Sequence, residues 1–127
     1  MSQQYTLLRQ QSFGPRQPTQ LHLRASDLRR VLAPLQGEVV HVDIETNGLD
    51  PRVPGARVVT LGLAHSSGLW VFDTRYWSDR DWDLCNDLLS GCRVVAFNAA
   101  FELKWLRVPG RCPDLRLHGC SLVLYRT

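Results

Sequence analysis

The sequence predicts one α/β domain built on a mixed β-sheet with helices on its faces. Three observations support this class: short β-branched runs, helical apolar spacing in segments between them, and a four-residue connection that suits only an antiparallel strand pair. The chain has 127 residues, of which 44% are hydrophobic and 21% are charged. These values fit a single core and argue against disorder and against a coiled coil.

The N-terminal part is expected to contain an appendage and then a helix. Gln, Pro and Ser are frequent in residues 1–20, which we interpret as an appendage or irregular edge strand ahead of a domain over 21–127. Ser26 is a good N-cap, and Pro34 and Gly37 favour an end, so a short amphipathic helix is predicted between them. Its apolar positions follow the i, i+3, i+4, i+7 spacing: Leu28, Val31, Leu32 and Leu35.

Three strands are expected next. Residues 38–44 form a β-branched run between a glycine and a set of turn residues, which predicts a buried strand. Residues 58–64 and 69–72 are two further apolar runs. Because only four residues separate them, these two runs predict an antiparallel hairpin.

The second half of the chain predicts two helices and two short strands. A Ser-x-x-Asp start and apolar residues on one face predict a helix over 78–89. Residues 93–97 predict another buried strand, and residues 99–106 predict a helix with Asn98 as its N-cap. A short strand over 115–118 is expected after these, followed by the first turns of a helix.

The connection between the strands at 38–44 and 93–97 passes through a helix. Such a crossover lets the two strands lie parallel and adjacent, and both strands then end at the same edge of the sheet. Open α/β sheets bind their ligands at that edge. Four polar residues are expected to gather there: Asp43, Glu45, Asn98 and Glu102.

The acidic residues at this edge suggest a metal site. Asp43 and Glu45 leave the strand on the same side, with Ile44 pointing into the core, and Glu102 lies one helical turn beyond Asn98. Neighbouring carboxylates repel unless a cation lies between them, and Mg²⁺ prefers such oxygen ligands. Taken singly, each residue also has a structural interpretation: a solvated acidic pair, a helix cap at Asn98 and a favourable helix-dipole position for Glu102.

Two segments resemble the signatures of a known nuclease superfamily. V-D-I-E-T-N-G-L-D, residues 42–50, resembles the first signature of the DEDD 3′-5′ exonucleases, and V-V-A-F-N-A-A-F-E-L-K-W-L, residues 94–106, resembles the second. Within that superfamily the sequence is most similar to the proofreading exonuclease domain of family-A DNA polymerases, phage-type versions included. The resemblance covers residues 38–124 and implies a ribonuclease-H-like fold.

The resemblance implies roles for named residues. It makes Asp43, Glu45 and Glu102 catalytic metal ligands, with Glu102 in the place that an aspartate usually holds. Two Mg²⁺ or Mn²⁺ ions would activate water and stabilise the leaving 3′ oxygen. Asn98 would contact the substrate or brace the site, with Phe101 packed beneath it. The loop that meets the 3′-terminal nucleotide would consist of Thr46, Asn47, Gly48 and Leu49, with Leu49 against a base.

The superfamily also has a fourth carboxylate, an aspartate on a later helix with a tyrosine or histidine nearby. Residues 103–127 are too few to contain the intervening helices, so we expect the fold to be incomplete at its C-terminus. Asp114 lies in a proline-containing turn, and we expect this residue, His118 and Tyr125 to be structural. Metal binding by three of four ligands is expected to be weaker.

Three functions remain open. The first is metal-dependent hydrolysis of phosphodiester bonds at a single-stranded nucleic-acid 3′ end, with DNA as the expected substrate and RNA as the other. The second is a weakly active or inactive exonuclease-like fragment that binds nucleic acid, or that docks on a polymerase domain or on the missing C-terminal part. The third is a plain structural α/β domain.

Charge, cysteines and hydropathy set further limits. A net charge of +3 and a pI near 8.9 permit a polyanionic partner without requiring one. The four cysteines include no CxxC pair, so reduced and mostly buried thiols are expected rather than a zinc site. The sequence shows no apolar run of membrane-spanning length and no signal-peptide pattern, so a cytoplasmic protein without a membrane partner is expected.

Overall fold

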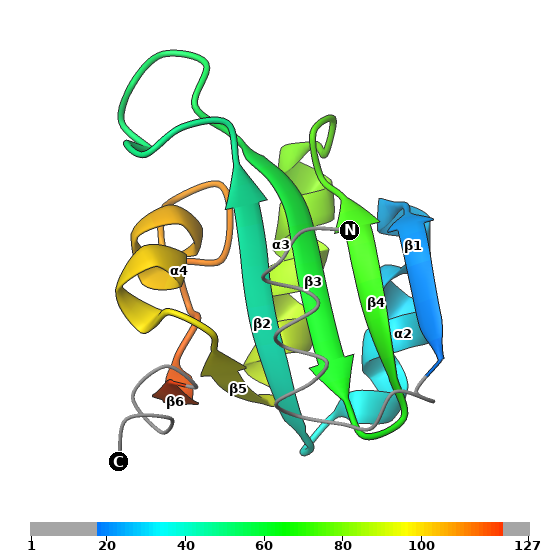
Figure 1. The fold of residues 1–127 in the computed structure, drawn as a ribbon. Coiled ribbons are helices and arrows are strands. Elements are labelled where there is room, and N and C mark those ends of the chain that lie inside the picture. Colours follow the sequence, from blue (N-terminus) through cyan, green and yellow to red (C-terminus); the bar gives the residue numbers. More distant parts are fainter. Residues whose placement is uncertain (1–17, 121–127) are drawn as a thin grey trace.

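The computed structural model describes residues 18–120, which form a six-stranded mixed sheet with helices packed against it (Figure 1). The strand order is β1-β4-β3-β2-β5-β6. This architecture confirms the predicted α/β class. The strands are β1 (Thr19–Leu23), β2 (Val39–Thr46), β3 (Val58–His65), β4 (Gly68–Asp73), β5 (Arg93–Ala96) and β6 (Leu117–Cys120). The helical segments are η1 (Ala25–Asp27), α2 (Leu28–Leu32), η2 (Ala33–Leu35), α3 (Asp79–Ser90) and α4 (Ala99–Leu106).

The strand pairing confirms the two connections that the sequence predicts. β3 and β4 form the expected antiparallel hairpin, and β3 also pairs antiparallel with β2. β5 returns parallel to β2 and directly beside it. The carboxyl ends of β2 and β5 therefore lie at one edge of the sheet, where the candidate site was expected.

The two outer strands agree with expectation in part, since an irregular edge strand was one interpretation of residues 1–20. β1 pairs parallel with β4, and the boundary expected after residue 20 falls inside this strand. The last strand was expected at 115–118 and lies two residues later, over Leu117–Cys120, parallel to β5. The helical turns expected beyond β6, and Tyr125 with them, lie outside the described residues.

The first helical segment confirms its predicted core positions but not its predicted cap. The four apolar positions are buried: Leu28, Val31, Leu32 and Leu35. Ser26 was expected to be the N-cap, which is wrong, because it lies inside η1. The Asp27 carboxylate instead accepts a hydrogen bond of 2.9 Å from the backbone N–H of Arg24, and this contact takes the place of the cap.

The start of α3 follows the predicted capping box. The Ser78 hydroxyl accepts a hydrogen bond from the Asp81 backbone N–H, and the Asp81 carboxylate accepts one from the Ser78 backbone N–H. Two backbone donors that the helix itself leaves unpaired are thereby satisfied.

Ser78→Ala is therefore expected to lower the free energy of unfolding by about 1 kcal/mol, because it removes the acceptor for one of those donors. Ser26→Ala is the matched control, since Ser26 is exposed and does not cap η1, and we expect a change below about 0.5 kcal/mol. Urea denaturation measures both values. Equal losses in the two variants would contradict the assigned cap.

The main core lies between the sheet and the helices α2 and α3, which cover the same face of the sheet (Figure 1). Alternate residues of β2, namely Val40, Val42 and Ile44, belong to this core. Because side chains alternate along a strand, Asp43 and Glu45 lie on the opposite face. The sequence thus separates the acidic side chains of β2 from its hydrophobic ones.

The cysteines are free thiols in this structure. Cys85 and Cys112 are buried with their sulfur atoms 4.0 Å apart, whereas Cys92 and Cys120 are partly exposed. The contact with the Cys112 thiol, together with burial, raises the pKa of Cys85 well above its usual range. Over residues 18–120, none of the helices is long and apolar enough to cross a membrane.

Candidate active site

The buried carboxyl group of Asp43 is the central feature of the site. Asp43 is fully buried in β2, and within residues 18–120 neither of its carboxyl oxygens accepts a hydrogen bond from an N–H or hydroxyl donor. Burying an unpaired carboxyl group costs several kcal/mol as a rule, so such groups are usually paired, protonated or bound to a cation. An exposed surface acid, the alternative interpretation of this residue, does not fit its burial.

Helix α4 brings Glu102 to Asp43. The side chain of Asn98 accepts a hydrogen bond from the Phe101 backbone N–H, which confirms the expected N-cap. Glu102 is 1% exposed, and its Oε2 atom accepts a 3.0 Å hydrogen bond from the Asn98 backbone N–H. Its Oε1 atom is buried and has no hydrogen-bond donor in the part of the chain that the structure describes. Asn98 therefore caps α4 through its side chain and orients the Glu102 carboxylate through its backbone N–H.

Burial shifts the pKa values of both carboxyl groups and strengthens the interaction between them. Burial raises the pKa of Asp43, and the negative charge of Glu45 raises it further. Burial raises the pKa of Glu102 as well, and the facing Asp43 carboxyl adds to this effect. Without a cation, the pair therefore holds a proton at a pH where exposed carboxyl groups are ionised.

Glu45 lies close to this pair but has another contact. It is half-buried, and its Oε1 atom accepts a 3.0 Å hydrogen bond from the hydroxyl of Thr60, its cross-strand neighbour on β3. The pairing register shifts directly after it, because Thr46 pairs with Val58. Irregular registers of this kind re-aim side chains and are common beside active sites.

The structure thus brings two of the three expected carboxyl groups together. Within residues 18–120, no group of three or more His, Cys, Asp or Glu side chains is placed to hold a metal ion. The ligand chemistry nevertheless fits a hard divalent cation, since three buried carboxyl oxygens of Asp43 and Glu102 have no hydrogen-bond donor among the described residues.

The loop between β2 and β3, residues 47–57, is built partly by the side chains expected to meet the substrate. Asn47 closes its base: Oδ1 accepts from the Arg57 backbone N–H at 2.9 Å and Nδ2 donates to the Gly55 carbonyl at 2.8 Å. The Thr46 hydroxyl donates to the Gly48 carbonyl at 2.6 Å. The Leu49 side chain is 82% exposed. The Thr46 and Asn47 side chains thus bond to the loop itself, whereas the Leu49 side chain is open to solvent.

Two cationic side chains near this loop were missed by the sequence reasoning. Lys104 Nζ donates a 2.8 Å hydrogen bond to the Leu49 carbonyl, and Arg111 Nη2 donates a 3.3 Å bond to the Ala56 carbonyl. The only signal for Lys104 in the sequence is that it is the sole lysine and follows Glu102 by two residues.

Phe101 and Gly48, which were also expected to contact the substrate, lie on α4 and in the 47–57 loop. Phe101 is partly buried on α4, and its ring centre is 6.3 Å from that of Trp105. A Cβ atom at Gly48 would meet nothing within 4 Å, so no steric contact inside the described structure requires glycine there.

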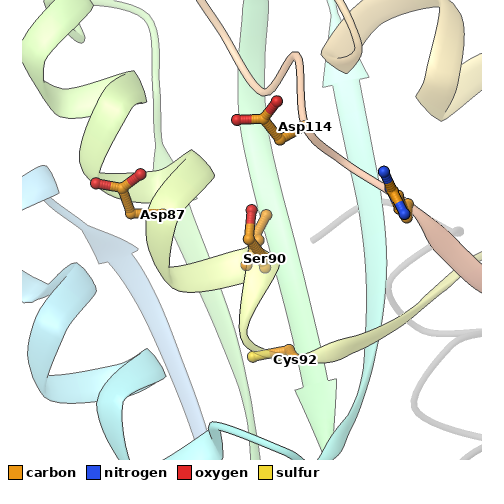
Figure 2. Close-up of a pocket in the computed structure, with 6 residues that line it drawn as sticks. Asp87, Ser90, Cys92 and Asp114 are labelled. Atoms are coloured by element: carbon orange, nitrogen blue, oxygen red, sulfur yellow. The ribbon is translucent and has the colours of Figure 1, made fainter.

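Asp114 lies in a different part of the molecule. It exchanges two hydrogen bonds with the Asn86 side chain, of 2.9 Å and 3.1 Å, which agrees with the structural role expected for it. It also lines a cavity of about 550 Å³ beside the C-terminal end of α3 (Figure 2). The residues around this cavity are separate from the carboxyl site: Asp87, Leu89, Ser90, Cys92, Asp114 and Arg116.

Three solved structures show which fold this arrangement belongs to. The EXO domain of Aedes aegypti Nibbler matches at a TM-score of 0.59 and 14% identity, over 85% of this chain and 55% of that one. Trypanosoma brucei RNase D in complex with RNA U12 matches at a TM-score of 0.66 and 13% identity, over 88% of this chain and 40% of that one. The catalytic core of RRP6 from Trypanosoma brucei matches at a TM-score of 0.63 and 13% identity, over 82% of this chain and 28% of that one.

The chain shares their fold. This similarity confirms the ribonuclease-H-like class expected from the two sequence signatures. The chain spans about half of the Nibbler domain, and less of the other two structures. No protein-family model matches the sequence, and no curated protein matches it.

Proposed function

We propose that this chain is a metal-dependent 3′-5′ exonuclease domain that hydrolyses phosphodiester bonds at nucleic-acid 3′ ends. The main support is the buried, unpaired carboxyl pair of Asp43 and Glu102 at the carboxyl edge of a ribonuclease-H-like sheet. A buried acid pair of this kind costs stability and is typical of functional sites. The fold shared with RNase D and the RRP6 catalytic core supports the same reaction class.

Asp43, Glu45 and Glu102 are the residues that would hold the metal. A bound Mg²⁺ or Mn²⁺ pair supplies a nucleophilic water and charge stabilisation at the leaving oxygen. The chain itself supplies the rest: Asn98 fixes Glu102 through the backbone contact at the helix start, and Leu49 presents an apolar side chain for the terminal base. Burial keeps bulk water away from the two carboxyl groups.

The substrate follows from the sequence resemblance and from one neighbour. The resemblance to family-A polymerase proofreading domains favours single-stranded DNA, and a polymerase domain would then be the partner. The RNase D structure that shares this fold is a complex with RNA U12, which favours RNA. We propose a single-stranded 3′ end as the substrate class common to both.

A labelled-strand assay tests this function. Purified protein with Mg²⁺ or Mn²⁺ is expected to shorten 5′-labelled single-stranded DNA or RNA stepwise from the 3′ end, and chelation with EDTA is expected to stop the reaction. Both nucleic acids are run in parallel, with a 3′-phosphorylated strand as a polarity control. Absence of shortening on both strands, with either metal, would contradict the proposal.

A second candidate is a nucleic-acid-binding module without turnover. One observation favours it: the described residues bring two carboxyl groups into contact, and Glu45 is hydrogen-bonded to Thr60. Fewer ligands weaken metal binding and leave the attacking water less well oriented. Protein that retains strands in a gel-shift experiment but does not shorten them would support this candidate.

A further inference from the structure

The loop over residues 47–57 is attached to the α4 region at two points. Lys104 Nζ, on α4, donates to the carbonyl of Leu49 at 2.8 Å. Arg111, after α4, donates to the carbonyl of Ala56 at 3.3 Å and to that of Trp105 at 2.7 Å. Charge-assisted hydrogen bonds of this kind are stronger than neutral ones. Both loop carbonyls are 55 residues away in sequence from their donors, so these contacts fix tertiary geometry.

The loop is also braced by hydrogen bonds among its own residues. Asn47 bonds to residues 55 and 57 through both ends of its amide. Asp50 holds Arg52 through backbone and side-chain contacts of about 3 Å. Because the base is closed, a contact at the Leu49 carbonyl constrains the direction of the whole loop tip.

The attachment point lies beside the carboxyl site. Lys104 follows Glu102 by two residues on the same helix, and α4 contacts β2, which contains Asp43. In Figure 1 the loop projects beyond the end of β2 on the side of α4. The hydrogen bond from Lys104 therefore links the loop that contains Leu49 directly to the helix that contains Glu102.

We propose that Lys104, assisted by Arg111, is a positioning residue that holds Leu49 where it contacts the terminal base of a strand whose 3′ end lies at Asp43 and Glu102. The proposal rests on the proposed function. It assigns Lys104 to the Leu49 carbonyl rather than to the nucleic-acid backbone. An ammonium group has three donors, so direct binding of a phosphate is the competing role.

A double-mutant cycle separates the two roles. Lys104→Met is expected to raise KM for a single-stranded substrate roughly fivefold, the equivalent of one lost hydrogen bond, with kcat and the melting temperature nearly unchanged. Leu49→Ala is expected to act similarly, and the double variant is expected to be no worse than Leu49→Ala alone. Lys104→Arg is expected to restore much of the affinity.

Two controls separate loss of the loop contact from loss of a positive charge. Arg107→Met removes one exposed positive charge at the end of the same helix and is expected to leave KM unchanged. A substrate with an abasic 3′-terminal residue is expected to abolish the difference between wild type and Lys104→Met. Additive losses in the double variant, or an equal loss on the abasic strand, would assign Lys104 to phosphate binding and overturn the proposal.

Hydrogen exchange tests the attachment without any nucleic acid. Backbone amides of residues 48–56 are expected to exchange faster in Lys104→Met than in wild type, whereas those of β2 and β3 stay protected. Unchanged exchange would overturn the attachment even in an active enzyme. A wild-type chain that neither binds nor shortens nucleic-acid strands would overturn the proposed function, and with it the role of Leu49. In that case, faster amide exchange in Lys104→Met would still establish that Lys104 holds the loop.

Discussion

Asp43→Asn is expected to abolish exonuclease activity while stabilising the metal-free protein. Loss of a metal ligand removes about 4 kcal/mol of transition-state stabilisation, which corresponds to roughly a thousandfold loss in kcat. The free energy of unfolding is expected to rise, because an amide carries no charge and offers an N–H donor to the unpaired Glu102 oxygen. Activity and stability then move in opposite directions.

The measurement pairs the labelled-strand assay with thermal unfolding in EDTA. Asp83→Asn is the matched control, since Asp83 is an exposed aspartate on α3, outside the site, and we expect normal activity and an unchanged melting temperature. A fall in the melting temperature of Asp43→Asn together with the fall in activity would show that the Asp43 carboxyl stabilises the fold. Its role would then be structural.

The metal-free protein is expected to lose stability as the pH rises from about 5 to 8. Burial raises the pKa of Asp43 from 3.8 to about 6. Burial and the facing Asp43 carboxyl raise the pKa of Glu102 from 4.5 to about 9. Between the unfolded and folded values the native state binds more protons than the unfolded state, so stability falls with rising pH. The expected loss is on the order of 3 kcal/mol.

Comparison with Glu102→Gln isolates this contribution, because exposed acids affect both proteins equally. The pH dependence of unfolding is expected to be flatter in the variant. Mg²⁺ or Mn²⁺ is expected to raise the melting temperature of the wild type at pH 8 more than at pH 5, since binding requires ionised ligands. If the free energy of unfolding depends on pH in the same way in the wild type and in Glu102→Gln, ionisation of Glu102 does not destabilise the metal-free protein.

The sequence predicts the elements that place the site because their patterns are local. The alternation along β2 puts Val42 and Ile44 in the core and Asp43 on the other face. The strand–helix–strand order makes β5 the parallel neighbour of β2. Asn98 is a local cap, so the start of α4 and the direction of its acidic residue follow from it.

The elements that sequence reasoning misplaced or missed depend on weak or non-local signals. β1 is an edge strand with mostly exposed side chains, so it lacks the apolar alternation that marks a half-buried strand. The Ser26 cap is wrong because η1 begins at Ala25 with Arg24 as its N-cap, and the Asp27 carboxylate accepts a hydrogen bond from the Arg24 backbone N–H. The Thr60 contact of Glu45 depends on cross-strand register, which the irregularity after Glu45 alters.

The contacts of Lys104 and Arg111 could not be predicted for a different reason. Their acceptors are backbone carbonyls, which every residue offers, so no residue type marks the partner. Only the folded chain selects Leu49 and Ala56 among them. Side-chain pairs such as Asp43 with Glu102 are easier to anticipate, since both partners are recognisable by type.

The shortness of β5 has a consequence for solubility. Its ladder with β2 ends at the pair of Val42 and Ala96, so beyond this point β2 pairs with β3 alone over residues 43–46 in the described structure. An open strand edge is a template for aggregation, and inward-pointing charges are one natural protection against it. Asp43 and Glu45 occupy that edge. Acidic side chains at this position are thus of the kind that discourages another strand from pairing with β2 there.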